Sequence, residues 1–330
     1  MKSTFRMLVA VSAALWISYG TTNAQDLSTT LNALGSANVS TYISPLLNSF
    51  AAGMNNAIYY SADLHGVLGF DIGLRVGVVK IKDDAKSFDF VMPDQISFTS
   101  GANTVTLYAG ADYDKTTSAA PTVAGSTDPF NVLVKNTSIY TALRGQKLLP
   151  VDIKGFNVGY LGSFAPQINV GLPLGLEVMA RYSPPIPAGD FGKVAFAGFG
   201  LRYDVDQFLP LFPVDIAVHF MTQSITMKDK AEQEIFTGKG TAYGVEVSKS
   251  LLFLTVFGGF QLQSAKMKLG AIDGKIGNTP YHLDSFEQDG PNKSQVTVGV
   301  RVLLLLVNVH AEANFAGTPT YGLGVGITFR

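Results

Sequence analysis

The stretch from His65 to Val79, HGVLGFDIGLRVGVV, alternates between two kinds of residue. Every second residue from Leu68 to Val78 is apolar, whereas the intervening positions are mostly glycine, with Asp71 and Arg75 among them. A period of two is typical of a β-strand with two unlike faces. In a soluble sheet the second face usually carries Thr, Lys or Glu. Glycine and isolated charges opposite an apolar face instead indicate a strand with lipid on one side and a barrel lumen on the other.

The same alternation recurs at residues 167–182, 214–220, 295–302 and 307–315. Pro173 interrupts the first of these segments and predicts a hairpin there. The repetition predicts an all-β fold, a single antiparallel transmembrane β-barrel. Strands of about 9–11 residues would give roughly 12–14 strands in a chain of this length, and we favour 14.

Polar residues on the second face of these segments are the candidates for the lumen. We expect the following side chains to face the lumen: His65, Asp71, Arg75, Glu177, Arg181, Arg202, Asp215, His219, Arg301, His310 and Glu312. An isolated charge in a confined interior is costly. We therefore expect the four arginines to meet the acidic residues across neighbouring strands.

The first 24 residues have the pattern of a secretory signal peptide. Lys2 and Arg6 form a basic region, Met7 to Ile17 form an apolar region, and Ala24 is a small residue at the expected cleavage site. This apolar region is too short to be a membrane-spanning helix. With this segment removed, we expect an N-terminal helical segment at 25–56 and the transmembrane barrel at 57–330.

The composition agrees with a membrane barrel and excludes other classes. Hydrophobic residues make up 47% of the chain and charged residues 15%, yet no run of about 18 apolar residues follows the signal peptide. A net charge of −1 gives no indication of a nucleic-acid partner. The chain has no cysteine, which excludes disulfides, thiolate chemistry and Cys-type zinc sites.

Residues 26–56 differ from the rest because their apolar residues have helical spacing. Ser44 followed by Pro45 is a favourable start for a helix, so we expect one or two short helices before the first strand. Two interpretations remain open: a periplasmic leader packed under the barrel, or a plug docked at or inside the periplasmic end of the lumen. The side chains expected to contact the inner wall as a plug are Ile43, Leu46, Leu47 and Phe50.

The connections between the alternating segments fall into two classes. LPLFP at 209–213 and the leucines near Leu304 are short. The long polar connections are predicted at residues 80–95, 109–148, 183–192, 222–238 and 264–294. Outer-membrane barrels have short periplasmic turns and long outer loops. The chain ends in YGLGVGITFR, an apolar and aromatic alternation that resembles the signal by which the barrel assembly machinery of Gram-negative bacteria recognises its substrates.

Three stretches together resemble a family of outer-membrane barrels that is catalogued only as a domain of unknown function. They are ADLHGVLGFDIGLRV at 62–76, PQINVGLPLGLEVMARYSPP at 166–185 and GFGLRYDVDQFLPLFPVDIAV at 198–218. The resemblance implies a barrel of the broad type of the long-chain fatty-acid (FadL-like) transporters, with an N-terminal segment before the first strand. It implies no catalytic residue.

No constellation of residues points to an enzyme. His310 and Glu312 share one face, but no GxSxG elbow accompanies them. The four histidines are scattered and do not have metal-ligand spacing. We therefore expect no catalytic site, no metal and no cofactor. The glycines on the inner face either relieve crowding in a curved wall or make room for a segment that fills the lumen.

These observations predict export to the outer membrane of a Gram-negative bacterium. The favoured function is passage or binding of a small hydrophobic ligand through a partly plugged lumen. The alternative is a non-transporting structural or surface-interaction barrel. The expected partners are outer-membrane lipid, the barrel assembly machinery and a small hydrophobic ligand, with no nucleic acid.

Overall fold

The computed structural model describes residues 27–100, 103–189, 192–209, 211–276 and 278–329. The predicted signal peptide, residues 1–24, lies outside the described residues. Among the described residues, no helix combines the length and the hydropathy needed to cross a bilayer.

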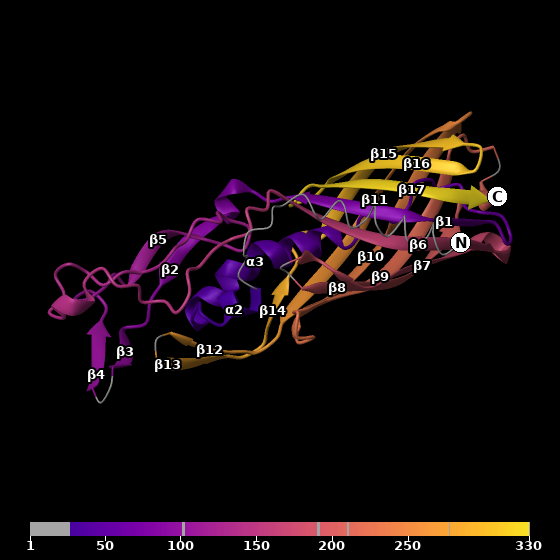
Figure 1. Ribbon diagram of the computed structural model, residues 1–330. Helices are drawn as coiled ribbons and strands as arrows, with labels where there is room; N and C mark the ends of the chain where they lie inside the picture. The colour runs from indigo at the N-terminus through magenta and orange to yellow at the C-terminus, as the bar shows by residue number, and fades with distance from the viewer. Residues whose placement is uncertain (1–26, 101–102, 190–191, 210, 277, 330) are drawn as a thin grey trace.

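Ten antiparallel strands form a closed barrel, which confirms the predicted fold class (Figure 1). In chain order these strands are β1 (Phe70–Lys80), β6 (Tyr160–Leu172), β7 (Leu176–Pro187), β8 (Lys193–Asp204), β9 (Asp215–Lys228), β10 (Glu234–Leu251), β11 (Leu254–Leu269), β15 (Ser294–Leu304), β16 (Val307–Phe315) and β17 (Thr320–Phe329). Pairing of β1 with β17, and of β10 with β11, completes the circle.

The strand number of 12–14 was wrong, for two physical reasons. Residues 81–159, between β1 and β6, contribute no strand to the barrel. Several wall strands are also longer than the 9–11 residues that a bilayer needs, and β10 has 18. Residues 222–238, predicted as a long loop, belong mainly to β9 and β10 and contain only a short turn.

The two ends of the barrel differ. At the turn end, short connections join the strands at residues 173–175, 205–214, 252–253 and 305–306. The hairpin predicted at Pro173 is one of these and is confirmed. Phe70 at the start of β1 pairs with Phe329 at the end of β17, so the chain terminus also lies at the turn end (Figure 1). The opposite end is the loop end, and in outer-membrane barrels it is the extracellular one.

An elongated extension continues from the loop end (Figure 1). It contains the antiparallel strand pairs β2 (Ser87–Val91) with β5 (Thr116–Pro121), β3 (Gln95–Ser100) with β4 (Asn103–Tyr108), and β12 (Ile272–Ile276) with β13 (Thr279–Leu283). The short strand β14 (Phe286–Asp289) joins it to β11, and single-turn helices lie at Asp83–Ala85 and Thr141–Leu143. A further single turn, Asp206–Phe208, lies at the turn end.

The N-terminal segment is helical, as predicted. Helix α2 spans Leu27–Leu31 and α3 spans Ser36–Gly53, so α3 begins before Ser44, and Pro45 lies within it. Both helices lie at the junction of the extension and the barrel (Figure 1). The plug candidates Ile43, Leu46, Leu47 and Phe50 are buried in the apolar core that α3 shares with the extension and the loop end of the barrel. The rings of Phe50 and Phe236 on β10 are 5.4 Å apart.

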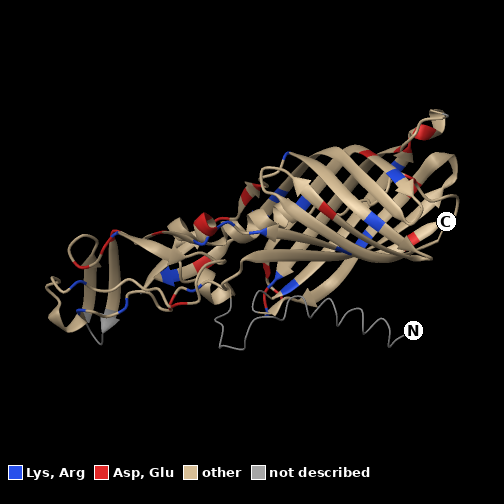
Figure 2. Cartoon of the chain, turned by 90° about the horizontal axis from the view of Figure 1, so that it is seen from above, with Lys and Arg blue, Asp and Glu red and all other residues tan. Residues whose placement is uncertain are grey.

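The strands change character along their length. On β11 the outward side chains Val256, Phe260 and Leu262 are apolar, but Ser264 and Lys266, which follow toward the loop end, are polar. The inward side chains change in the opposite sense, from Gln261 and Gln263 to Ala265, Met267 and Leu269. This inversion is expected at the level where the outer surface of the wall passes from lipid into water. At the same level the inner surface begins to pack on the apolar helix α3. Along the strands, charged residues occur as isolated positions in a mostly uncharged wall (Figure 2).

Candidate functional site

Residues 54–69, the lumen segment, run through the barrel from the loop end to the turn end. Near the loop end, Asn55 lies against β10 and β11, with its side-chain amide donating to the carbonyl of Thr241 at 3.4 Å. Near the turn end, His65 contacts Thr328 of β17. The wall therefore begins at Phe70, so residues 57–65, assigned to the barrel wall from sequence, lie inside it instead, and Gly66, Val67 and Leu68 are exposed beside the turn after β6. The segment enters from the loop end. Docking at the periplasmic end stays a prediction, and the general rule that long loops are extracellular argues against it.

Wall side chains satisfy the backbone of the lumen segment, which forms no regular structure of its own. Glu312 accepts a hydrogen bond from the backbone N–H of Ala57 at 2.8 Å, and Gln167 donates to the carbonyl of Ile58 at 3.0 Å. Gln223 donates to the carbonyl of Met54 at 2.9 Å. Buried backbone groups need such partners. These polar wall residues thus hold the segment in place.

Glycines give the lumen segment the space it needs. A Cβ added at Gly171 would lie 2.2 Å from the carbonyl oxygen of Gly66, and one added at Gly259 would lie 2.4 Å from the hydroxyl oxygen of Tyr59. Only a residue without a side chain allows these approaches. The contacts favour the interpretation that the inner-face glycines accommodate a filled lumen.

One charge cluster lies around Arg202 on β8. Its guanidinium binds Glu177 of β7 at 2.7 Å, and it also pairs with Glu246 of β10 and donates to the carbonyl of Ser61 in the lumen segment. His65 contacts Glu177 at 2.6 Å, and His219 of β9 contacts Glu246 at 2.8 Å. The cluster links four wall strands, β7 to β10, to the lumen segment.

A second charge cluster surrounds Tyr60. Arg75 binds Asp71 on its own strand at 2.5 Å, and Asn308 donates to the other carboxylate oxygen of Asp71 at 2.6 Å. The guanidinium carbons of Arg75 and Arg301 lie 4.9 and 4.6 Å from the centre of the Tyr60 ring. These distances are within the range of cation–π attraction. The ring of His310 lies 5.1 Å from the same tyrosine.

Arg181 on β7 binds neutral oxygens. It donates to Gln167 at 2.6 Å, to Gln223 at 3.0 Å and to the carbonyl of Asn56 at 3.0 Å. Arg202 pairs with acids on neighbouring strands, as expected. Arg75 instead pairs with Asp71 on its own strand. The carbonyls that Arg181 uses belong to a segment without alternation, so no pattern in the sequence indicates this contact.

The structure places ten of the eleven lumen candidates among the buried residues, and these ten are His65, Asp71, Arg75, Glu177, Arg181, Arg202, His219, Arg301, His310 and Glu312. Asp215 is only half-buried near the turn end, where Ser248 donates to it at 3.0 Å. Glu246 was missed, although the alternation around it in VEV of β10 could have identified it. Tyr60 and Asn56 lie in the lumen segment, where no periodic pattern marks them.

The wall is incompletely paired between β6 and β7. Their hydrogen-bonded register ends at Gln167 and Arg181, although β6 continues along β1 to Tyr160 and β7 continues along β8 to Pro187. Pro166 on β6, and Pro184, Pro185 and Pro187 on β7, have no N–H to donate to a neighbouring strand. We call the unpaired portions, residues 160–166 and 182–187, the seam.

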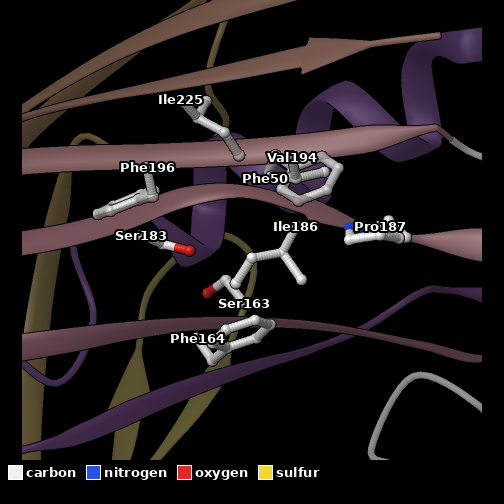
Figure 3. A pocket seen from close by; sticks show the side chains of 10 residues that line it. Phe50, Ser163, Phe164, Ser183, Ile186, Pro187, Val194, Phe196 and Ile225 are labelled. Atoms are coloured by element: carbon white, nitrogen blue, oxygen red, sulfur yellow. The ribbon is translucent and has the colours of Figure 1, made fainter. Parts of the chain in front are cut away.

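A small apolar crevice of about 30 Å³ lies at the seam. Phe164 of β6, Ile186 of β7 and Phe196 of β8 line it, and Phe50 of α3 lies on its inner side (Figure 3). In Figure 3, Ile186 points across the gap toward Ser163 and Phe164. The crevice joins the lipid-facing wall to the helix that occupies the loop end of the lumen.

A closed antiparallel barrel with an apolar outer band and a polar, occupied lumen defines the chain as an outer-membrane β-barrel protein. Among the described residues, no group of three His, Asp or Glu side chains could hold a metal ion. The sequence matches the family of unknown function DUF6588 over residues 1–329, and the chain belongs to that family.

Comparison with curated proteins gives no significant match. Three of the similar solved structures are distant in sequence. The attachment invasion locus protein Ail of Yersinia pestis is 10% identical, covering 80% of this chain and 100% of that one, with a TM-score of 0.24. The toluene transporter TbuX of Ralstonia pickettii is 10% identical, with coverages of 91% and 99% and a TM-score of 0.24. A FadL homologue of Pseudomonas aeruginosa is 7% identical, with coverages of 86% and 97% and a TM-score of 0.22. Scores of this size carry no argument about function.

Proposed function

We propose that this outer-membrane barrel binds a small hydrophobic ligand that enters sideways from the lipid through the seam between β6 and β7. The signal peptide at residues 1–24 would direct export, and the C-terminal strand would be recognised by the barrel assembly machinery. The observation that carries the proposal is the end of strand pairing at Gln167 and Arg181, directly beside an apolar crevice.

The physical argument starts from the cost of an interrupted wall. Unpaired backbone groups facing lipid are costly, so a wall strand normally pairs along its whole length. Prolines reduce this cost because they lack the N–H that would remain unsatisfied. The four prolines of the seam thus allow a lateral gap at a place where the side chains behind it are apolar. An apolar molecule in the outer leaflet would find a continuous apolar surface there.

Binding is better supported than free passage. The lumen segment fills the barrel beyond the crevice, and the adjoining cavity beside Ala57 and Arg181 has a volume of about 10 Å³. A ligand that crossed the barrel would have to displace residues 54–62, which the wall holds through several hydrogen bonds. Passage would therefore require rearrangement of the lumen segment.

Bridging the seam tests the proposal. Ala165 and Ser183 would face each other if the register of Gln167 with Arg181 continued, and the chain has no native cysteine. A165C/S183C, joined by a disulfide or a short bifunctional thiol reagent, should lose binding of the fluorescent apolar probe N-phenylnaphthylamine. Reduction of the disulfide should restore binding. The control is F199C/T222C, a pair across the fully paired β8–β9 wall, which should keep binding. Equal binding by the bridged and unbridged seam variants would contradict the proposal.

The extension supports the alternative of a surface-interaction barrel. Residues 81–159 build hairpins beyond the loop end and share an apolar core with α3. A barrel that served only as a membrane conduit would not need so large a structured addition. Removal of residues 95–108, the β3–β4 hairpin, should leave probe binding unchanged if the seam acts alone, and should abolish attachment to cells or surfaces if the extension is the functional part.

A further inference from the structure

Each of the four short connections at the turn end, and the chain just before β1, contains a leucine in the left-handed backbone conformation. The φ angles of these leucines lie between 55° and 76°, and no other leucine among the described residues has a positive φ. A left-handed backbone is unfavourable for a residue with a Cβ atom, so glycine and asparagine are the usual residues at such positions. We call these leucines the turn-end crown, which consists of Leu68, Leu174, Leu211, Leu252 and Leu305.

The side chains of the crown do not pack in the protein. Leu211, Leu252 and Leu305 are at least 96% exposed, and Leu68 and Leu174 are 76% and 81% exposed. They add almost nothing to the core, although their backbone conformation is unfavourable, so folding of the chain does not account for them. A contiguous apolar surface of this kind indicates contact with a membrane or a partner. Other exposed apolar side chains on the same turns enlarge it: Leu209, Phe212, Phe253 and Leu306.

The longest of these connections, residues 205–214, keeps its acidic side chains away from its apolar tip. Asp206 accepts a hydrogen bond at 2.7 Å from the backbone N–H of Ile216, which lies in β9. Asp204 accepts one at 3.2 Å from a backbone N–H within the turn. Both residues are half-buried. The tip at Leu211 is therefore apolar, even though the connection contains charged residues.

The apolar outer band of the wall is too short for a membrane unless the crown is added to it. On β11 the outward apolar side chains run from Leu254 to Leu262, and Ser264 follows. This distance is about 27 Å along the strand, or about 19–22 Å across a membrane at the usual tilt of a barrel strand. The apolar band of an outer-membrane barrel is about 25 Å tall. Leu252 and Phe253 continue the band past Leu254 without an intervening polar residue.

The two boundaries of the band carry different aromatic side chains. A tyrosine suits a membrane–water interface because its ring is apolar and its hydroxyl is polar. Tyr243 pairs with Leu262, at the last apolar level of β11 before the loop end. At the turn end the exposed aromatic residues of the turns, such as Phe212 and Phe253, have no polar group. The exposed tyrosines of the wall are Tyr160, Tyr182, Tyr243 and Tyr321.

One lysine indicates how deep the crown lies. Lys249 is exposed on the outer face of β10, where it pairs with Val256 of β11, close to the turn end. A lysine at the edge of the hydrocarbon extends its ammonium group to the lipid headgroups. The headgroups must therefore lie within reach of this side chain. That places the crown close beneath them and not at the centre of the bilayer.

We propose that the turn-end crown is a lipid-binding surface, immersed among the acyl chains of the leaflet on the turn-end side. The short turns of outer-membrane barrels ordinarily face the periplasm. Here the headgroups lie level with the turns or beyond them, and hydrocarbon surrounds this end of the barrel. Continuity with the lipid-facing wall, the height of the band and the position of Lys249 support lipid as the partner. The proposal does not rest on the seam, which lies toward the loop end.

Depth-dependent quenching tests the proposal on the purified full-length protein in vesicles of phosphatidylethanolamine and phosphatidylglycerol. The chain has no native cysteine, so Leu174→Cys, Leu252→Cys and Leu305→Cys each take one thiol-reactive fluorophore. We expect strong quenching by lipids with a nitroxide on the acyl chain, and little quenching by iodide present on both sides of the membrane. Val298→Cys, on the outer face of β15, is the control for hydrocarbon, and Ile139→Cys, on the exposed surface of the extension, is the control for water.

Two other results would overturn the proposal. Labels on the crown that iodide quenches as strongly as the label on Ile139→Cys would place the turns in water. Protection from both quenchers would exclude lipid as the partner. Cross-linking of the crown cysteines between molecules by a bifunctional thiol reagent would then identify a second copy of the chain as the occupant.

A second measurement separates lipid contact from folding. The variant L174N/L211N/L252N/L305N keeps the left-handed turns, because asparagine adopts this conformation readily, but removes the apolar side chains. It should retain the heat-modifiable mobility of the native protein in neutral detergent. Its insertion should fall more steeply than that of the native protein from dimyristoleoyl- to dioleoyl- to dierucoyl-phosphatidylcholine vesicles, because its apolar band is shorter. L133N/I139N, two exposed apolar residues of the extension, is the matched control. The same thickness dependence in all three proteins would contradict the proposal.

Discussion

Glu312 on β16 accepts a hydrogen bond at 2.8 Å from the backbone N–H of Ala57, a residue 255 positions earlier in the chain. Both groups are buried, and the same carboxylate also accepts from Asn314 at 2.8 Å. The contact joins the barrel wall to the segment that fills it. It shows that the polar inner face is adapted to the lumen segment and not to bulk water.

Replacing Glu312 should therefore loosen the lumen segment. Glu312→Leu leaves the N–H of Ala57 and the amide of Asn314 without an acceptor, which should cost about 1–3 kcal/mol. Hydrogen exchange at residues 54–62 should accelerate in this variant. Glu312→Gln keeps an acceptor and should show a smaller change. Unchanged exchange in E312L would show that the contact does not hold the segment.

Conductance should depend on how much of the N-terminal segment is removed. Deletion of residues 27–50 removes most of α3 but leaves the lumen segment in place, so conductance in a planar bilayer should remain small. Deletion of residues 27–62 removes the part that fills the lumen and should give a large, steady conductance. Retention of the heat-modifiable mobility typical of folded barrels is the control for folding. Large conductance from the intact protein would exclude a closed lumen.

Arg202 should be the most sensitive of the buried charges. Arg202→Met leaves Glu177 and Glu246 buried without their shared cation. Breaking a buried ion pair from one side typically costs about 3–5 kcal/mol. Lys268→Met on the exposed outer face of β11 is the matched control and should change stability little. Both are compared by unfolding in urea, and similar midpoints would contradict the prediction.

Gly171 should not tolerate a side chain. Gly171→Ala would place a methyl group 2.2 Å from the carbonyl oxygen of Gly66, so the lumen segment would have to shift. Overpacking of this kind typically costs about 1–3 kcal/mol. Gly159→Ala meets no atom within 4 Å and is the matched control. The loss of thermal stability should be confined to the first variant.

The imidazole of His282, in the β12–β13 hairpin of the extension, should titrate above the ordinary range of a histidine. Hydrogen bonds to Asp273 and Asp284 raise the pKa of His282 above its ordinary value. The pKa of His282 is higher in the folded protein than in the unfolded chain, where it is about 6.5. Protonation of His282 therefore stabilises the folded hairpin fully below that pH, and this stabilisation is lost as the pH rises through the raised pKa. NMR titration of the imidazole should show the raised pKa, and Asp273→Asn should lower it. An identical pKa in both proteins would rule out this pairing.

The sequence by itself determined the two faces of the wall and the helical nature of the N-terminal segment. A strand that separates lipid from a lumen must alternate, whatever its neighbours are, so Ile72 and Asp71 reveal their sides locally. Only the tertiary structure decided the strand number, the end from which the lumen segment enters, the partners of Arg181 and the seam. These features depend on which distant segments pair and where the pairing stops. A period of two is the same in a ten-stranded and a fourteen-stranded barrel, because it reports the surroundings of each side chain and not the identity of the next strand.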